Sequence, residues 1–288
     1  VDTAQDSKEI ELKAGLNRFD STVQDDFKKI PGSPVAYWLS DKVFNIFDSM
    51  ESIGSIADFK QGMSTTDAER FVRRWMEVPL YNINFYKYNG KGKGAKWFPF
   101  NKGGDFRKWY GNNEFLVLYE NDGEDLISLV REKYPKISDP EFVIKNRKRY
   151  FLESVSYTAI SSSNFGARLM PQGFIFSIGG PVIQSSKLSN HLILGLMLSK
   201  YASKIIQALS PTLNFQAIDL EKVPVLSAFQ ENSIIKEKVE KCVDSLVSIS
   251  RTDWDSYETS WDFTENPVIR MGQPNLEQAF NTWQQQNA

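Results

Sequence analysis

The pattern of hydrophobic and polar positions predicts several helices along the chain. After an entry rich in proline and glycine, the apolar residues of 35–47 suggest a helix. The segment 125–134 reads as a second helix, and 187–209 as one long, mostly buried helix that stops at Ser210-Pro211. These segments supply the helical half of the expected fold.

Short apolar runs without helix caps predict strands between these helices. Residues 53–62 read as a strand that ends at Gly62, and 115–121 as another. Aromatic strands are expected within 97–130, β-rich segments within 145–180, and a last strand in 215–225. Helices and strands therefore alternate irregularly, and the predicted fold class is mixed α/β.

Two local patterns carry more specific expectations. Residues 66–69 read T-D-A-E, which is the capping box of a helix that begins at Thr66. A heptad-like spacing of apolar residues predicts a helix with a narrow seam that packs on another helix. The seam consists of Ile235, Val239, Cys242, Leu246 and Ile249.

We expect three parts along the chain. Residues 1–45 form a linker and entry helix, 46–226 a mixed α/β body, and 227–288 a helical spacer and C-terminal segment. The sequence does not begin with methionine, so we expect a piece of a longer protein.

Composition excludes several kinds of chemistry. The 288 residues carry a net charge of −2, one cysteine and one histidine, so neither a disulfide framework nor a His/Cys zinc cluster can be assembled. The longest apolar run is far shorter than a membrane span, and a reducing, cytoplasmic location is expected. Glu11 and Lys13 form an isolated E-x-K without the strand-borne aspartate that a nuclease needs.

The stretch 91–113, KGKGAKWFPFNKGGDFRKWYGNN, combines basic residues, glycines and aromatics. It lacks the spacing of a phosphate-binding P-loop, because Trp97 follows Lys96 where Ser or Thr is needed. Seven basic residues against one acid in 87–108, and a second basic cluster in 145–149, favour contact with a polyanion such as DNA. For the aromatics alone, we expect packing in a core.

Five segments carry a more specific signal. They are GMSTTDAERFVRRWMEV (62–78), KWFPFNKGGDFRKWYGNNEFLVLYENDGEDL (96–126), YTAISSSNFGARLMPQGFIFSIGG (157–180), LSPTLNFQAIDLEKVPV (209–225) and DWDSYETSWDF (253–263). In this order they resemble segments of the BREX phage-defence adenine-specific DNA methyltransferases, the PglX family. The layout is also similar to that of type I restriction specificity subunits, in which a recognition domain leads into a spacer helix.

The resemblance implies a target recognition region that follows a catalytic domain. The chain contains no N-P-P-Y motif and no glycine-rich S-adenosylmethionine loop, and Asn266-Pro267 continues with Val-Ile. We therefore expect no enzymatic activity and no cofactor in this fragment, with S-adenosylmethionine bound by the missing domain. The expected partners are double-stranded DNA, the methyltransferase domain of the same parent chain, and other defence-system proteins, without a membrane.

The resemblance and the charge pattern together give a set of candidate DNA-binding residues. Basic side chains would bind phosphates, Asn, Gln and Arg would read base edges, and the Thr-capped turn would offer N–H groups to a phosphate. The candidates are Gln61, Thr65, Thr66, Arg70, Lys91, Lys93, Lys96, Asn101, Lys102, Arg107, Lys108, Asn112, Asn113, Arg147, Lys148, Arg149, Ser162, Ser163 and Arg168. A protein-interaction module, a separate DNA specificity subunit and an independent enzyme remain as alternatives.

Overall fold

A computed structural model divides the chain into two compact units, residues 1–51 and 52–288. The described residues are 5–16, 23–30, 32, 33, 39, 41–85, 95–161, 163–210, 212–227, 229 and 232–286. The described residues of the first unit form the short helices α1 (Gln5–Lys13), α2 (Gln24–Phe27) and α3 (Asp41–Ser49). The helix expected at 35–47 thus begins at Asp41 within the described residues.

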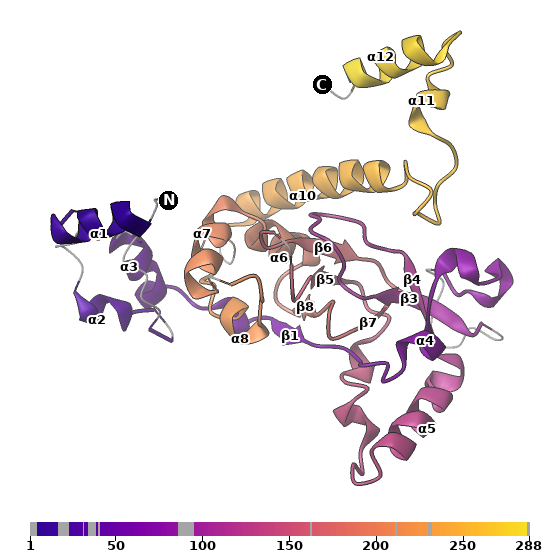
Figure 1. Ribbon diagram of the computed structural model, residues 1–288, viewed down its shortest axis with the longest axis horizontal. Coiled ribbons are helices and arrows are strands. Elements are labelled where there is room, and N and C mark those ends of the chain that lie inside the picture. Colours follow the sequence, from indigo (N-terminus) through magenta and orange to yellow (C-terminus); the bar gives the residue numbers. More distant parts are fainter. Residues whose placement is uncertain are drawn as a thin grey trace. The chain divides into compact units, whose positions relative to one another are not determined.

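Two four-stranded sheets form the framework of the second unit (Figure 1). One sheet has the order β1 (Asp58–Lys60), β8 (Val182–Gln184), β5 (Ser154–Tyr157), β6 (Ala167–Met170), and its neighbours are all antiparallel. The other has the order β2 (Val72–Arg74), β4 (Phe115–Leu118), β3 (Trp97–Asn101), β7 (Ile175–Phe176), in which only β3 and β7 are parallel. The mixed α/β fold predicted from the pattern is confirmed.

One hydrophobic core joins the two sheets. Phe100 and Phe176 from one sheet and Met170 and Val182 from the other belong to the same buried cluster. Aromatic rings meet edge to face within it, as Tyr150 does with Phe176. The aromatics of 97–119 are therefore largely core residues, as their composition favoured.

Short helices connect the strands. The α-helices are α4 (Ala68–Phe71), α5 (Glu124–Lys133) and α8 (Ala217–Leu220). Single 3₁₀ turns occupy Ile53–Ser55, Trp75–Glu77, Leu80–Asn82, Glu120–Asp122, Pro140–Phe142 and Arg147–Arg149. The last strand expected at 215–225 is wrong, because α8 forms there and only Pro224 makes an isolated β-bridge, with Ser52.

The cap of α4 lies one residue later than the capping box predicts. The side chain of Asp67 accepts a hydrogen bond from the backbone N–H of Arg70 at 3.0 Å. Thr66 has a left-handed backbone (φ 62°), and its buried hydroxyl has no hydrogen-bond partner among the described atoms. The local signal was right about a helix start and wrong about the residue that caps it.

The long helix expected at 187–209 is two helices, α6 (Asn190–Met197) and α7 (Lys200–Leu209), bent by 66° at their junction. Leu198 is the C-cap of α6, and Ser199 is the N-cap of α7, since its hydroxyl accepts from the N–H of Ala202. Within the part of the chain that is described, no single helix has the length and apolarity to cross a membrane. Among the described helices, only α6 and α7 taken together, as a bent pair, reach that length and apolar composition.

The C-terminal helix α10 (Ser233–Trp254) packs on α6 through a face that differs from the predicted seam. Val243 and Val247 are buried, and a Cβ on Gly195 of α6 would lie 3.0 Å from a methyl group of Val239 and 3.0 Å from one of Val243. Ile235, Cys242 and Ile249 are exposed, so the seam prediction is wrong at these three positions.

The chain beyond α10 first returns to the body and then forms a separate helix pair. Trp261 packs against Phe85 and Phe174, with ring centroids 5.0 and 5.9 Å away. The helices α11 (Pro267–Arg270) and α12 (Leu276–Gln286) follow, and they are drawn in yellow beyond α10 in Figure 1.

Candidate nucleic-acid interface

A groove lies where the loops after β3, β5 and β7 meet. Because β3 and β7 are parallel, both chains leave the sheet at the same edge. The N–H of Ala159 donates to the carbonyl of Gly179, and the N–H of Phe215 to the carbonyl of Ala159. The groove encloses about 810 Å³ and is lined by Gln61, Lys102, Gly104, Lys145, Thr158, Ala159, Ile160, Ile178, Gly179, Asn214, Gln216, Ala217 and Ile218.

Glycines allow the backbones at this edge to approach closely. A Cβ on Gly103 would meet the carbonyl oxygen of Gly179, and one on Gly62 would meet the carbonyl of Phe176. Gly103 also has a φ of +90°, which favours glycine. The floor of the groove is therefore a tightly packed junction of main chains.

Asn101 is a structural residue of this junction. Its side chain is buried, donating to the hydroxyl of Ser156 and to the carbonyl of Gly180 at 3.1 Å, and accepting from the N–H of Gly103 at 3.1 Å. These bonds engage the amide that was expected to read a base edge. Asn101 holds the start of the loop instead.

Arg168 holds the same loop from beneath. Its guanidinium, 2% exposed, donates to the carbonyls of Gly103 and Arg107 and to the hydroxyl of Thr158 at 3.1–3.3 Å. Burial, with the charge of Arg107 as a smaller cause, lowers the pKa of Arg168 to about 10. Its hydrogen-bond partners are two carbonyls and a hydroxyl rather than a carboxylate, so a positive charge lies just beneath the groove.

Other predicted readers support the loop from its far side. The amide of Asn112 donates to the carbonyls of Gly103 and Asp105 at 2.9 and 2.8 Å. Asn113 is buried, and its amide nitrogen has no hydrogen-bond partner among the described atoms. Asn112 therefore helps to position the loop, whereas no hydrogen bond connects the amide nitrogen of Asn113 to it.

Arg107 connects the loop to α10. Its guanidinium donates to the carbonyl of Tyr110 at 2.8 Å and to the carboxylate of Asp253 at 2.5 Å, and lies over the ring of Trp254. One side chain thereby joins the groove loop to the end of the C-terminal helix.

The groove itself combines cations, amides and apolar side chains. Its two cations are Lys102 and Lys145, and no carboxylate is among the described residues that line it. The amides belong to Gln61, Asn214 and Gln216, and the apolar side chains to Ile160, Ile178 and Ile218, all three exposed. Such a surface can bind an anionic polymer and also contact the edges of its bases.

Two arginines of the 145–149 cluster are engaged within the fold. Arg147 donates to the hydroxyl of Tyr119 and to the carbonyl of Asp122, and Arg149 to the carboxylate of Asp58. The hydrogen bond from Arg149 is the first cause that holds the pKa of Asp58 below its usual value. Lys148 is exposed, and the structure does not place it in the groove.

The remaining described candidates lie outside the groove lining. Lys96 pairs with Glu120 at 3.3 Å, Arg70 with Asp125 at 3.8 Å, and the ammonium of Lys108 lies 5.9 Å from the ring of Phe106. Thr65, Thr66 and Ser163 also do not line it. Lys91, Lys93 and Ser162 lie outside the described residues.

The list of candidates missed four polar groove residues and all the apolar ones. Lys145 stood in the recognised basic cluster, so its charge was a usable signal. Gln216 and Ile218 lie within the segment read as a strand and Asn214 directly precedes it, and nothing local distinguished them. Thr158 follows β5 directly and offered no signal of its own. Among the residues that the structure describes, no cluster of three His, Cys, Asp or Glu side chains is placed to hold a metal ion.

Comparison with known proteins identifies relatives over nearly the whole chain. No family model matches it. It is 38% identical over 273 residues to the adenine-specific methyltransferase BrxX of Escherichia coli O9:H4 (strain HS), covering 93% of this chain and 21% of that protein. It is 36% identical over 282 residues to the adenine-specific methyltransferase PglX of Lacticaseibacillus casei (strain Zhang), covering 94% of this chain and 22% of that protein.

These matches extend through both units and include all five segments of the resemblance. The chain spans about a fifth of the length of the curated relatives it matches. The resemblance to the PglX family is thereby confirmed, and the chain is a homologue of one portion of the BREX adenine-specific methyltransferases.

Proposed function

We propose that this chain is the target recognition region of an adenine-specific DNA methyltransferase in a phage-defence system, and that it binds double-stranded DNA through the groove. The observation that carries the proposal is the groove lining, in which two lysines and three amides meet without a carboxylate. Homology to adenine-specific methyltransferases supports DNA as the polyanion.

Each class of side chain in the groove has a task in this proposal. Lys102 and Lys145 neutralise phosphates and fix the position of the duplex. Gln61, Asn214 and Gln216 present amides that pair with the N6 and N7 edge of adenine. The exposed isoleucines contact the methyl group of thymine.

The buried set beneath the groove positions these contacts. Asn101, Asn112 and Arg168 hold the loop that carries Lys102, so that the lysine is presented from a fixed backbone. The ammonium of Lys102 lies 4.5 Å from the centre of the Phe115 ring, a cation–π contact that restrains the lysine side chain.

The methyl transfer itself belongs to the rest of the parent protein in this proposal. An adenine methyltransferase must extrude its target base, and the duplex has to be held while that happens. The sequence offers neither an N-P-P-Y motif nor a glycine-rich loop for S-adenosylmethionine, so we assign no chemical step to these residues. In this proposal the chain works in the cytoplasm together with the catalytic domain of the parent protein, and that domain binds the methyl donor.

The test is the salt dependence of duplex binding by Lys102→Gln and Lys145→Gln variants. Each substitution removes one phosphate contact, so each should weaken binding at low salt and flatten the slope of log affinity against log salt by about 0.9. Fluorescence anisotropy with a random-sequence duplex at several salt concentrations measures both quantities.

Lys136→Gln is the matched control, because Lys136 is exposed and lies outside the groove lining. This variant loses the same charge, and its slope of log affinity against log salt should equal that of the unsubstituted chain. Slopes that are equal in all three variants would refute the groove as the DNA-binding site.

A further inference from the structure

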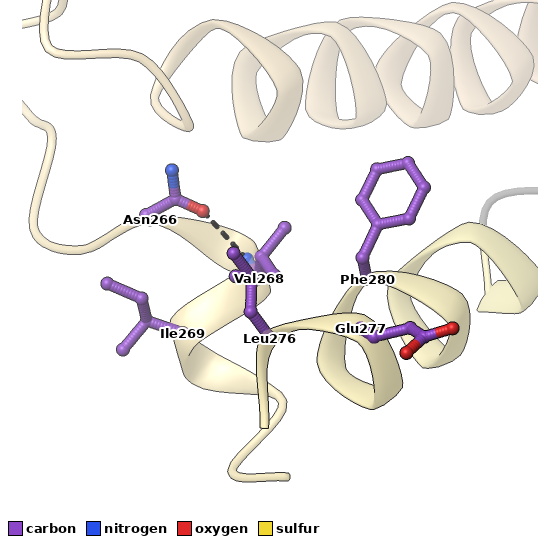
Figure 2. A pocket seen from close by; sticks show the side chains of 6 residues that line it. All are labelled: Asn266, Val268, Ile269, Leu276, Glu277 and Phe280. Carbon is purple, nitrogen blue, oxygen red and sulfur yellow. Dashed lines mark hydrogen bonds between the residues drawn. The ribbon is translucent and has the colours of Figure 1, made fainter. Parts of the chain in front are cut away.

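The helix pair at the C-terminal end exposes a cluster of apolar side chains. Ile269 is 71% exposed, Leu276 74% and Phe280 46%. Figure 2 shows that these side chains, with Val268, surround a hollow between α11 and α12, which encloses about 650 Å³. Monomeric proteins rarely leave so contiguous an apolar surface open to water without a partner.

The cluster continues toward the end of α10. A neighbouring hollow of about 850 Å³ joins Ile249 and Tyr257 to Val268, Met271 and Phe280. Ile249 is 66% exposed on the side of α10 that faces away from α6. We call Ile249, Tyr257, Val268, Ile269, Leu276 and Phe280 the C-terminal apolar surface.

The helices that carry this surface are well specified without a hydrophobic core of their own. Asn266 caps α11 through the N–H of Val268 at 2.9 Å, and Asn275 caps α12 through the N–H of Gln278 at 3.0 Å. Only Ala279 of α12 is buried. The helical fold presents the apolar side chains outward instead of hiding them.

The segment that carries this surface is acidic by composition. Residues 249–288 contain six carboxylates and two basic side chains, Arg251 and Arg270. Arginine side chains pair with four of these carboxylates, those of Asp253, Asp255, Asp262 and Glu265. An apolar centre in a segment with a surplus of negative charge fits a protein surface that is apolar with a basic rim.

We propose that the C-terminal apolar surface is the docking face for the remaining part of the parent methyltransferase. The relatives are about five times as long as the matched portion, so most of a parent of that length would lie outside this structure. That larger part would be covalently joined to the chain and present at high effective concentration. The inference shares with the proposed function the premise of a longer parent, but it does not depend on DNA binding.

Hydrogen exchange in the intact parent protein tests this docking. Leu276→Ser with Phe280→Ser removes apolar contacts from the interface and leaves the helix caps in place. The amides of Leu276–Gln286 should then exchange about tenfold faster or more than in the unsubstituted parent, because docking is what slows their opening. Amides of β4 and α6 should be unchanged, which shows that the body remains folded.

The control is Phe142→Ser, which alters a phenylalanine that is 69% exposed and lies outside the surface. It should leave the exchange of α12 unchanged. Equal exchange of α12 with and without the double substitution would overturn the proposal. Loss of the protection of the α12 amides when the parent protein is diluted would also overturn the proposal, because the docked partner would then be a second copy of the protein.

The two proposals can fail separately. Duplex binding by the parent with Leu276→Ser and Phe280→Ser should keep the salt slope of the unsubstituted parent, since no lysine is lost. A changed exchange rate with an unchanged slope supports the docking face alone.

Discussion

The groove and the C-terminal apolar surface are built in opposite ways. At the groove, polar and charged groups such as Asn101 and Arg168 are buried and hydrogen bonded. At the C-terminal surface, apolar groups such as Ile269 and Leu276 are exposed, and Glu277 is the carboxylate that lines the hollow with them. At the groove, buried hydrogen bonds hold the loop that carries a cation. At the C-terminal apolar surface, apolar side chains remain unburied.

This difference indicates what each region recognises. A polyanion needs cations held by a rigid backbone, and the glycine junction provides that backbone. A protein partner is bound mainly through apolar area at the centre of a patch. Substitutions of the buried residues beneath the groove should therefore act on stability, whereas substitutions at the C-terminal surface should act on association.

The largest expected effect follows from Arg168→Met. The variant leaves the carbonyls of Gly103 and Arg107 and the hydroxyl of Thr158 buried without their donor. The free energy of unfolding should fall by about 2–3 kcal/mol. Chemical denaturation followed by tryptophan fluorescence measures it.

Lys108→Met provides the comparison for Arg168→Met, since it removes a charge from an exposed residue of the same loop. It should change the free energy of unfolding by less than about 0.5 kcal/mol. If both variants were equally stable, the groove edge would not depend on its buried polar groups, and the contrast between the two regions would disappear.

A smaller effect is expected on α10, which connects the two regions. Val243→Ala should lower the free energy of unfolding by about 2 kcal/mol, because Val243 is buried against Gly195 of α6. Ile249→Ala, on the exposed side, should change it by less than about 0.5 kcal/mol. Thermal and denaturant unfolding of both variants would show which face of α10 is packed. A larger loss of stability in Ile249→Ala than in Val243→Ala would support the seam predicted from the sequence.

The smallest effect concerns the ion pair of Asp58 and Arg149 at the edge of the first sheet. The hydrogen bond from Arg149 places the folded-state pKa of Asp58 below 3.8, so the pair contributes stability above that pH and loses it as the pH falls through the folded-state pKa. Because Asp58 is half-exposed, the contribution should be below about 1 kcal/mol.

Asp58→Asn should therefore be slightly less stable than the parent sequence at neutral pH, and the two should converge in acid below about pH 4. Denaturant titrations across this pH range measure the difference. A gap that widens in acid would show that the pair does not stabilise the fold.

The sequence predicted those elements whose signals are local. β4 and α5 were found because a short apolar run and a periodic segment each specify one structure. The break between α6 and α7 was missed because the segment is apolar on both sides of Ser199. That pattern indicated one continuous helix, and a single serine is too weak a signal to predict a new helix start. α8 was read as a strand because its four residues are too few to show a helical period.

The groove was predicted only in part, because its members come from distant loops. Gln61 and Lys102 were named, whereas Asn214 and Gln216 lie more than a hundred residues farther along the chain. Asn101 and Arg168 were named for base reading, which their burial does not favour. The sequence alone does not distinguish a polar side chain that is hydrogen bonded within the fold from one that is exposed and able to bind a ligand.

Arg107 has a consequence that reaches beyond the loop it stabilises. It bonds the loop to the carboxylate of Asp253 and lies over Trp254, at the end of the helix that leads to the C-terminal surface. A shift of that helix end on docking would therefore move the support of the groove. By thermodynamic reciprocity, DNA held in the groove would then alter the affinity of the docked partner by the same factor, and the two binding events would be energetically coupled.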